Sequence, residues 1–315
     1  MSMKGKKAGI LQAGAIFPLV PALASGLRSL GYRSDVLAFE EHPFGFDSDY
    51  YFPLDGSNKS LMRLITKWSI QFIGDYSVFH FHVKSFTESG IDLLFLRTMG
   101  KRVIIHHHGS DLRGWGEKNT NNRFAHGILV STPDLLDWSP RATYLPSPIL
   151  LDFYSNVGVE KKGANERIRI VHAPSKRAVK GTEQIIRTVD DLKRSGYNVE
   201  LLLVEKMAHK EAIEFYRKAD IIIDQINDLG VHGLVSIEAM ALGKPVICSI
   251  SSEYDEYYPS IPVVSSDAGA LKSRLMSLIE DSGLRHDLGQ KGRKYVESRH
   301  DPIKVASTLE KIYDL

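Results

Sequence analysis

Groups suited to binding an anion occur in the second half of the chain. Gly233 precedes a segment of good helix formers that runs from Leu234 to about Leu242. The first-turn amides, from Gly233 to Ser236, are therefore expected to lack intrahelical acceptors, and the helix dipole adds about half a positive charge at the same end. Lys180 stands just before an earlier predicted helix, where its ammonium group could reach the same ligand. The chemistry this predicts is the binding of a phosphate or diphosphate.

Glu238 adds a second kind of group to this segment. It lies about one turn into the predicted helix, where a carboxylate can accept hydrogen bonds from a sugar diol while backbone amides hold phosphate. An ordinary strand–helix–strand crossover with a solvated glutamate explains the same spacing equally well. Spacing alone leaves both interpretations open.

Two strands in the first half of the chain carry histidines. Alternation along residues 76–82 places His80 and His82 on one face, and alternation along residues 103–108 does the same for His106 and His108. Histidines at strand ends are compatible with zinc. No cysteine lies nearby in the sequence, and we expect no metal.

The segment His108-Gly109-Ser110-Asp111 follows the second of these strands. Open α/β sheets bind ligands at the carboxyl ends of their strands, so this loop is a candidate binding element. The alternative is a histidine that is satisfied within the sheet edge.

The elements around these groups alternate between strand and helix, which predicts an α/β fold. In the second half, predicted strands cover 168–172, 199–204, 221–223 and 246–248, and predicted helices cover 182–194, 209–218 and 234–242. In the first half, a strand over 7–12 precedes a turn of small residues that contains Gly14 and a helix over 17–30. A lone glycine in such a turn is a weak signal for phosphate binding.

Composition restricts the class of protein. The chain has 315 residues, room for two domains of about 150 residues each. With 40 Lys and Arg against 38 Asp and Glu, the charge balance gives no reason to expect nucleic acid. One cysteine, Cys248, suits a reducing compartment. No apolar run suggests a membrane span or a signal peptide, so we expect a cytoplasmic protein.

Residues 59–73 predict an amphipathic helix. Its apolar face holds Leu61, Leu64, Ile65, Trp68 and Phe72, and basic residues lie on the other side. Such a helix either packs on the sheet or rests on an anionic bilayer at the inner membrane face.

The segment GVHGLVSIEAMALGKPVI, residues 230–247, resembles the donor-binding element of retaining GT-B glycosyltransferases of family 4. That element has the pattern E-G-F-G-L-x-x-x-E-A-M-A-x-G-x-P-V. The resemblance implies that Glu238 binds the ribose hydroxyls and that Gly233, Leu234 and Val235 face the diphosphate and sugar. Gly230 occupies the position of the first glutamate, which in the family contacts the donor sugar. A subgroup with glycine there has an upstream Asp-Gln pair like Asp224-Gln225.

The resemblance implies roles for further donor-site residues. Lys180 matches the lysine of an R-x4-K pair that clamps the diphosphate, while Ser175 occupies the arginine position, so Arg177 is the candidate substitute. Glu205 lies in the loop that is expected to pass the nucleotide base. Gly14 is expected in the loop that lines the cleft.

The candidates for the catalytic group are His108, Asp111 and His232. His108 and Asp111 match the H-G-x-D element of the family, whose histidine faces the donor sugar. Because Gly230 removes an acidic contact, Asp228 or His232 from the same loop is expected to replace it.

The resemblance implies a GT-B architecture, in which two Rossmann-like domains face each other across a cleft. Residues 1–150 form the acceptor-side domain, with a helix at 300–315 packing back on it, and residues 165–299 form the donor-side domain. The implied activity is metal-independent, retaining transfer from a nucleotide-diphosphate sugar to a saccharide, lipid or small-molecule acceptor, with no cofactor. Assembly of cell-surface polysaccharide is the implied setting.

Two other functions stay open at this stage. One is a catalytically silent GT-B protein that binds a sugar nucleotide or a partner protein. The other is a sugar-nucleotide epimerase, a class that carries several carboxylates at the sugar site. The sequence identifies neither the base, the sugar and the acceptor nor the oligomeric state.

Overall fold

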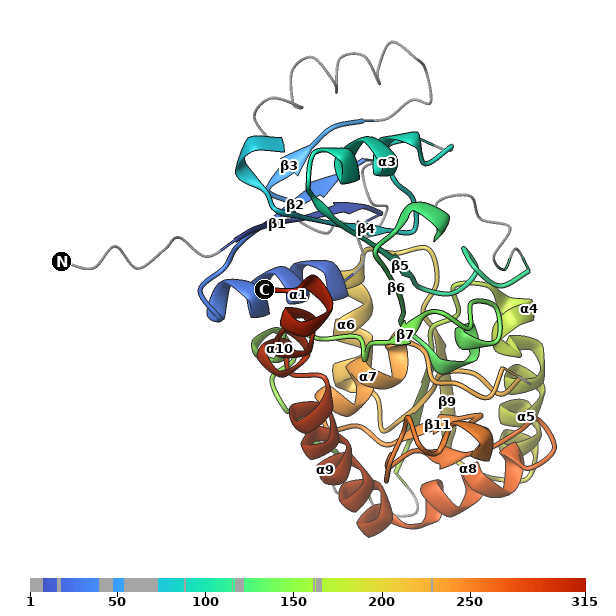
Figure 1. Cartoon of the computed structure of the whole chain (residues 1–315). Helices are drawn as coiled ribbons and strands as arrows, with labels where there is room; N and C mark the ends of the chain where they lie inside the picture. The colour runs from blue at the N-terminus through green and yellow to red at the C-terminus, as the bar shows by residue number, and fades with distance from the viewer. Residues whose placement is uncertain are drawn as a thin grey trace. The chain divides into compact units, whose positions relative to one another are not determined.

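The computed structural model describes residues 8–15, 18–39, 48–53, 73–87, 89–114, 116, 122–160, 162, 166–227 and 229–315. The chain divides into two compact units (Figure 1). The first consists of Met1–Leu150 with Asp301–Leu315, and the second of Leu151–His300. The C-terminal segment therefore packs with the N-terminal half of the chain.

The first unit contains a seven-stranded sheet in which the strand order is β3-β2-β1-β4-β5-β6-β7 and every neighbouring pair is parallel. The strands are β1 (Gly9–Gly14), β2 (Arg33–Ala38), β3 (Tyr50–Tyr51), β4 (Val78–His82), β5 (Arg102–His107), β6 (Gly127–Val130) and β7 (Thr143–Tyr144). Its helices are α1 (Leu19–Ser29), α3 (Ile91–Thr98) and α10 (Pro302–Tyr313), with short 3-10 turns η2 (Asn122–Phe124) and η3 (Pro133–Leu136).

Both faces of this sheet are covered, which explains why β1 and β4 are buried along their whole length. Alternate strand residues enter two separate cores. One core holds Ile10, Val78 and Ile104 together with residues of α1 and α10. The other holds Leu11, Phe79 and Val103 together with residues of α3.

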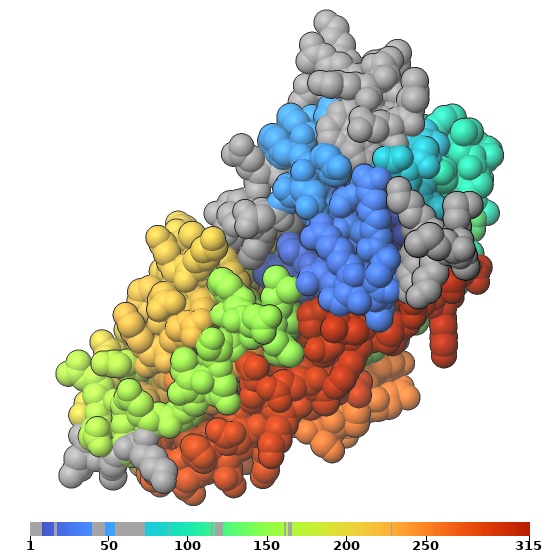
Figure 2. Space-filling view, turned by 90° about the vertical axis from the view of Figure 1, so that its left-hand side faces the viewer, coloured from blue at the N-terminus to red at the C-terminus, as the bar shows by residue number. Residues whose placement is uncertain are grey.

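Helix α1 lies directly against α10 (Figures 1 and 2, blue against red). The contact is close because Gly26 has no side chain: a Cβ there would lie 2.1 Å from the carbonyl oxygen of Pro302 and 3.0 Å from the Cβ of Ala306. Gly26 therefore sets the distance between the two helices.

Replacing Gly26 by alanine is expected to destabilise the first unit. Alanine would normally favour a helix by about 1 kcal/mol over glycine, but here its methyl group must displace the backbone of α10, at a cost of about 1–3 kcal/mol. Urea unfolding of the variant measures the net loss. Gly74→Ala is the control, because a Cβ at Gly74 would meet nothing within 4 Å. A Gly26→Ala variant as stable as the wild type would contradict this explanation.

The second unit contains a five-stranded parallel sheet in the order β12-β11-β10-β8-β9. The strands are β8 (Ile168–His172), β9 (Val199–Leu203), β10 (Ile221–Ile223), β11 (Val246–Cys248) and β12 (Val264–Ser265). The helices are α4 (Arg177–Lys180), α5 (Thr182–Arg194), α6 (His209–Lys218), α7 (Leu234–Ala241), α8 (Leu271–Glu280) and α9 (Ser282–Arg299), with 3-10 turns η4 (Leu151–Phe153) and η5 (Ser252–Tyr254).

The apolar face of α5 explains how this sheet is covered. Ile185, Val189 and Leu192 are buried and pack with β-branched residues of β8 and β10 and with apolar residues of α8. Each lies three or four positions from the next, the spacing of one helix face. The helical periodicity of apolar residues in 182–194 therefore accounts for the way α5 covers the sheet.

The amphipathic segment 59–73 lies almost wholly outside the described residues, as does Asp228. None of the helices that the structure describes is long and apolar enough to cross a membrane.

Candidate functional site

Lys180 is the last residue of α4, and its side chain extends to the amino end of α7. Its Nζ donates to Asp224 Oδ1 at 2.7 Å and to Gln225 Oε1 at 2.8 Å. Asp224 and Gln225 follow β10, so they lie at the carboxyl edge of the second sheet. This edge therefore holds an ammonium group at the start of a helix.

Asp224 also binds the first turn of α7. Its Oδ2 accepts from the Gly233 amide at 2.6 Å and from the Ser236 hydroxyl at 2.7 Å. Burial by itself raises the pKa of the Asp224 carboxyl, but the Lys180 ammonium and these donors outweigh burial, so the pKa lies below its usual value. Asp224 is therefore an ionised carboxylate with an exposed fraction of only 1%.

These bonds change which amides remain for a ligand. The sequence predicted four unpaired amides from Gly233 to Ser236, and this is wrong in two places. The Gly233 amide bonds to Asp224, and the Ser236 amide bonds to the Gly233 carbonyl at 3.2 Å. The amides of Leu234 and Val235 remain, because a first helical turn offers them no intrahelical acceptor. We call Lys180 and these two amides the anion cradle.

Gly233 is needed for a spatial reason. A Cβ there would lie 2.8 Å from Lys180 Nζ and 2.9 Å from Asp224 Oδ2. Any side chain would separate the ion pair from the helix start. The φ of Gly233 is −94°, which any residue can adopt. The glycine is therefore explained by the close approach of Lys180 and Asp224 and not by its backbone conformation.

Glu238 lies one turn further along α7, and only 2% of it is exposed. Its Oε1 accepts from Tyr154 Oη at 2.9 Å and lies 2.6 Å from His209 Nε2. Burial, and then the charge of Glu238, raise the pKa of Tyr154 well above its usual value, so the phenol stays a donor. Oε2 makes no hydrogen bond within the described part of the chain and is the acceptor left for a ligand.

Arg177 does not point to the anion cradle. Its guanidinium makes a two-point ion pair with Glu205, at 2.9 and 2.7 Å, and a further bond to Glu183 at 3.0 Å. Arg177 and Glu205 were predicted to contact the diphosphate and the base separately, and the structure brings them together with each other. Ser175, at the position of the family's arginine, is exposed.

Gly230 has a backbone that a glutamate would not adopt readily. Its φ is +64°, and a Cβ there would lie 2.6 Å from the Cβ of Ser251. The Gly230 carbonyl accepts from the Ser251 amide at 2.9 Å, which holds the loop in this position. The absence of the first glutamate is thus built into the packing of the loop.

A Gly230→Glu variant is accordingly expected to lose stability and to gain no activity. The left-handed φ and the contact with Ser251 should together cost about 1–3 kcal/mol. Gly196→Ala is the matched control, because Gly196 has a φ of +92° and a Cβ there would meet nothing within 4 Å. If Gly230→Glu were as stable as Gly196→Ala and more active than the wild type, the loop would be free to accept the family's residue.

His232 is buried, with 4% of it exposed, and its ring packs against Tyr258 at a centroid distance of 4.5 Å. Burial lowers the pKa of His232 to about 4. A neutral, enclosed ring does not replace a carboxylate at a sugar, so the structure gives no support to the predicted substitution by His232.

In the first unit, Asp111 organises the loop after β5. Its Oδ1 accepts from the amides of His108 and Gly109, at 3.0 and 2.7 Å, and its Oδ2 lies 2.8 Å from His107 Nδ1. Burial opposes ionisation, but His107 and His108 lower the pKa of Asp111 below its usual value. Asp111 therefore acts on the backbone of His108.

Both ring nitrogens of His108 are already bonded. Nε2 lies 3.0 Å from His82 Nδ1, and Nδ1 lies 2.7 Å from Ser131 Oγ. His82 Nε2 in turn lies 2.8 Å from Gln12 Oε1, a group that can only accept, so His82 donates from Nε2 and accepts at Nδ1. His108 therefore donates from Nε2 to His82 and accepts at Nδ1 from the Ser131 hydroxyl. A direct bond from this ring to a ligand would require one of these partners to be displaced.

Gly14 lies at the end of β1 with a φ of +127°, and a Cβ there would be 2.4 Å from the His82 carbonyl oxygen. Packing against β4 accounts for this glycine. Arg113, two residues after Asp111, is bonded to Asp134 at 2.5 and 3.0 Å.

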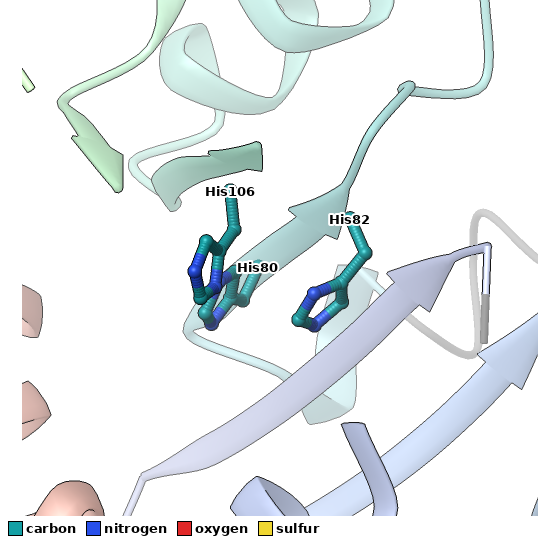
Figure 3. Close-up of side chains that lie close together, drawn as sticks. All are labelled: His80, His82 and His106. Atoms are coloured by element: carbon teal, nitrogen blue, oxygen red, sulfur yellow. The ribbon is translucent and has the colours of Figure 1, made fainter. Parts of the chain in front are cut away.

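His80, His82 and His106 lie together on neighbouring strands (Figure 3). One ring nitrogen of each lies within 4.8 Å of those of the other two. However, the His80 ring stacks on those of His82 and His106 with interplanar angles of 21° and 18°. Lone pairs lie in the ring planes, and planes this close to parallel do not meet at one ion. As arranged, the cluster is a stack of imidazoles rather than a set of converging ligands.

Several site residues escaped the sequence analysis. Tyr154 and His209 hold Glu238 from 84 and 29 positions away. Ser131, directly after β6, bonds the His108 ring, and Gln12 on β1 acts on that ring through His82. The sequence did contain one usable signal for Asp224 and Gln225. Two polar residues directly after a buried strand lie at the carboxyl edge of the sheet, where ligands bind.

Comparison with known proteins finds a family match for part of the chain. Residues 202–295 match the family model described as "Glycosyl transferases group 1". This segment is similar to the group 1 glycosyl transferases. It contains Glu205, Asp224, the first turn of α7 and Glu238, while Lys180 precedes it.

One relative of this group 1 segment is the capsular polysaccharide biosynthesis glycosyltransferase CapM of Staphylococcus aureus. The two are 26% identical over 163 residues, covering 43% of this chain and 43% of the relative. The match thus spans less than half of the length of CapM.

Solved structures show that the whole chain has the GT-B fold. Sucrose-phosphate synthase from Thermosynechococcus elongatus has a TM-score of 0.67 and 15% identity, covering 97% of this chain and 98% of that one. Anabaena HepE, in complex with UDP-glucose, has a TM-score of 0.64 and 12% identity over 97% and 100%. An alpha-glucosyltransferase, in complex with UDP-glucose and DNA, has a TM-score of 0.71 and 11% identity over 98% and 100%.

Proposed function

We propose that the protein is a glycosyltransferase that takes a sugar from a nucleotide-diphosphate donor. The observation that carries this proposal is the anion cradle, in which the Lys180 ammonium group lies at the amino end of α7 beside two amides without intrahelical acceptors. The family of residues 202–295 and the UDP-glucose in the HepE complex support it.

The cradle would stabilise the charge that grows on the leaving diphosphate. Lys180 Nζ and the amides of Leu234 and Val235 are fixed before the donor arrives, so little reorganisation is needed during transfer. Because these groups supply positive charge at the leaving group, we propose that transfer does not require a divalent cation. Activity should persist in excess EDTA.

Glu238 would bind the ribose. Tyr154 and His209 occupy Oε1 and fix the carboxylate, which leaves Oε2 to accept from a ribose hydroxyl. This arrangement predicts that Glu238→Gln weakens nucleotide binding, because the amide presents a donor where an acceptor is needed or turns away from Tyr154.

The finer features of the reaction are also proposals. The resemblance to family 4 supports retention of the anomeric configuration, and the capsular relative supports a saccharide or lipid-linked acceptor in surface polysaccharide assembly. A cytoplasmic enzyme with a lipid-linked acceptor would work at the inner membrane face. Proton NMR of the first product gives the anomeric configuration directly.

The test is a thermal-shift screen with UDP, GDP and ADP, followed by an assay of nucleotide release from the corresponding sugar conjugates. A ligand that binds only the folded state raises the melting temperature. We expect one nucleotide to stabilise the wild type and Glu238→Gln to lose that shift. No shift with any nucleotide, together with no release of nucleotide, would refute the proposal.

A second candidate is a GT-B protein that binds a sugar nucleotide without transferring the sugar. Two observations favour it: the loop excludes a glutamate at Gly230, and Arg177 is committed to Glu205. Stabilisation by a nucleotide without turnover of any donor and acceptor pair would select this function.

A further inference from the structure

Asp224 is enclosed between the two parts of the anion cradle. One oxygen bonds Lys180, and the other bonds the Gly233 amide and the Ser236 hydroxyl, all within 2.7 Å. No other described residue joins α4 to the first turn of α7 through one carboxylate. The direction of the Lys180 side chain is therefore set by Asp224, with Gln225 as a second acceptor.

Asp224 cannot itself bind the donor sugar. Its side chain is 0% exposed in the ion pair with Lys180, whose side chain is 13% exposed. Both of its oxygens already accept hydrogen bonds from the protein. It thus acts through Lys180 and α7 rather than by touching substrate.

The same carboxylate lowers the charge of the cradle. An ammonium paired at 2.7 Å with an ionised carboxylate presents little net charge to an arriving diphosphate. Asp224 therefore has two opposed effects. It orients the Lys180 side chain toward the ligand, but its negative charge repels the anion that Lys180 attracts. A nucleoside diphosphate product held by a full positive charge would leave more slowly.

We propose that Asp224 is a positioning residue of the donor site, which aims Lys180 at the leaving phosphate and weakens the hold on the nucleoside diphosphate product. This inference rests on the proposed function. A residue that merely stabilises the fold would, when replaced, weaken both turnover and product binding. Loss of Asp224 is instead expected to lower turnover while product binding is kept or strengthened.

The test compares Asp224→Asn with the wild type, using UDP as the probe in isothermal titration and UDP-glucose as the donor in the release assay. Asparagine keeps an acceptor for the Gly233 amide but removes the charge. We expect kcat to fall at least about tenfold, while UDP binds as tightly as before or up to about tenfold more tightly. Loss of UDP affinity in parallel with kcat would show a structural role only and overturn the proposal.

Asp220→Asn is the matched control. Asp220 lies before β10 as Asp224 lies after it, is 2% exposed and pairs with Lys162 at 2.6 Å, but has no bond to the cradle. This variant should lose stability with kcat unchanged. An equal fall of kcat in both aspartate variants would also overturn the proposal.

Ser236→Ala covers the case in which Asp224→Asn does not fold. It removes only one of the bonds that fix Asp224, so kcat should fall by about threefold or more, with UDP affinity retained. Hydrogen exchange of residues 233–236 adds a readout that needs no ligand, since a looser carboxylate speeds exchange of the Gly233 amide. Unchanged exchange and unchanged kcat would contradict the inference, whereas a wild type that binds and turns over no nucleotide sugar would contradict the proposed function.

Discussion

Lys180→Ala is expected to lower kcat/KM by about 100- to 1,000-fold, the usual effect of removing one preorganised group from a developing negative charge. The loss should appear mainly in kcat, because Lys180 Nζ is already held at 2.7 Å from Asp224 in the resting protein and contributes most when charge grows on the diphosphate. Steady-state kinetics with the donor found in the thermal-shift screen measures it.

The same change leaves the buried Asp224 carboxylate without its cation. Removing one partner of a buried ion pair costs about 3–5 kcal/mol, so Lys180→Ala alone confounds activity with folding. The double variant Lys180→Ala/Asp224→Ala removes both charges and should regain most of that stability without regaining activity. If the double variant recovered turnover as well, Lys180 would have no role beyond holding Asp224.

Acid is expected to destabilise the first unit as soon as the pH falls below about 6.5, before its carboxylates are protonated. Burial, and then the nearby His108, lower the pKa of His80 to about 3. Burial together with neighbouring imidazoles places the pKa values of His82 and His106 well below 6.5. These rings are neutral in the folded protein, whereas the unfolded chain protonates them below about pH 6.5.

The sign follows from proton linkage. Below about pH 6.5 the unfolded state binds protons that the folded state does not, so stability falls as pH falls toward the folded pKa values. Each ring contributes about 1.4 kcal/mol per pH unit in that window, and three rings about 4 kcal/mol. Since a domain is stable by about 5–15 kcal/mol, a loss of this size per pH unit is a large fraction of its stability.

Urea unfolding at pH 7, 6, 5 and 4 measures this slope. His80→Leu should reduce it by about 1.4 kcal/mol per pH unit, one proton's contribution. His286→Gln, on the exposed side of α9, should leave it unchanged. An identical slope in His80→Leu and the wild type would mean that the ring is charged in the folded state.

The sequence predicted well the features that depend on local pattern. The buried run Ile221–Ile223, the helix His209–Lys218 and the start of α7 at Leu234 lie where periodicity and helix formers placed them. The turn from strand into helix before Leu234 also predicted that amides of the first helical turn lack intrahelical acceptors, because this is a local property of a helix start.

The rest depended on contacts between distant segments. That Asp224 takes the Gly233 amide, that Tyr154 and His209 fix Glu238, and that Ser251 packs against Gly230 are tertiary facts. His108 illustrates the same limit: its motif was visible, but its partners His82 and Ser131 lie on β4 and directly after β6. Spacing identifies a residue type at a sheet edge, and packing decides which atoms remain for a ligand.

A crystal structure with the nucleotide selected by the thermal-shift screen tests the central claim most directly. We predict that the diphosphate lies within hydrogen-bond distance of Lys180 Nζ and of the Leu234 and Val235 amides, with a ribose hydroxyl on Glu238 Oε2. A nucleotide bound elsewhere, with Lys180 still bonded only to Asp224 and Gln225, would contradict the assignment of the donor site.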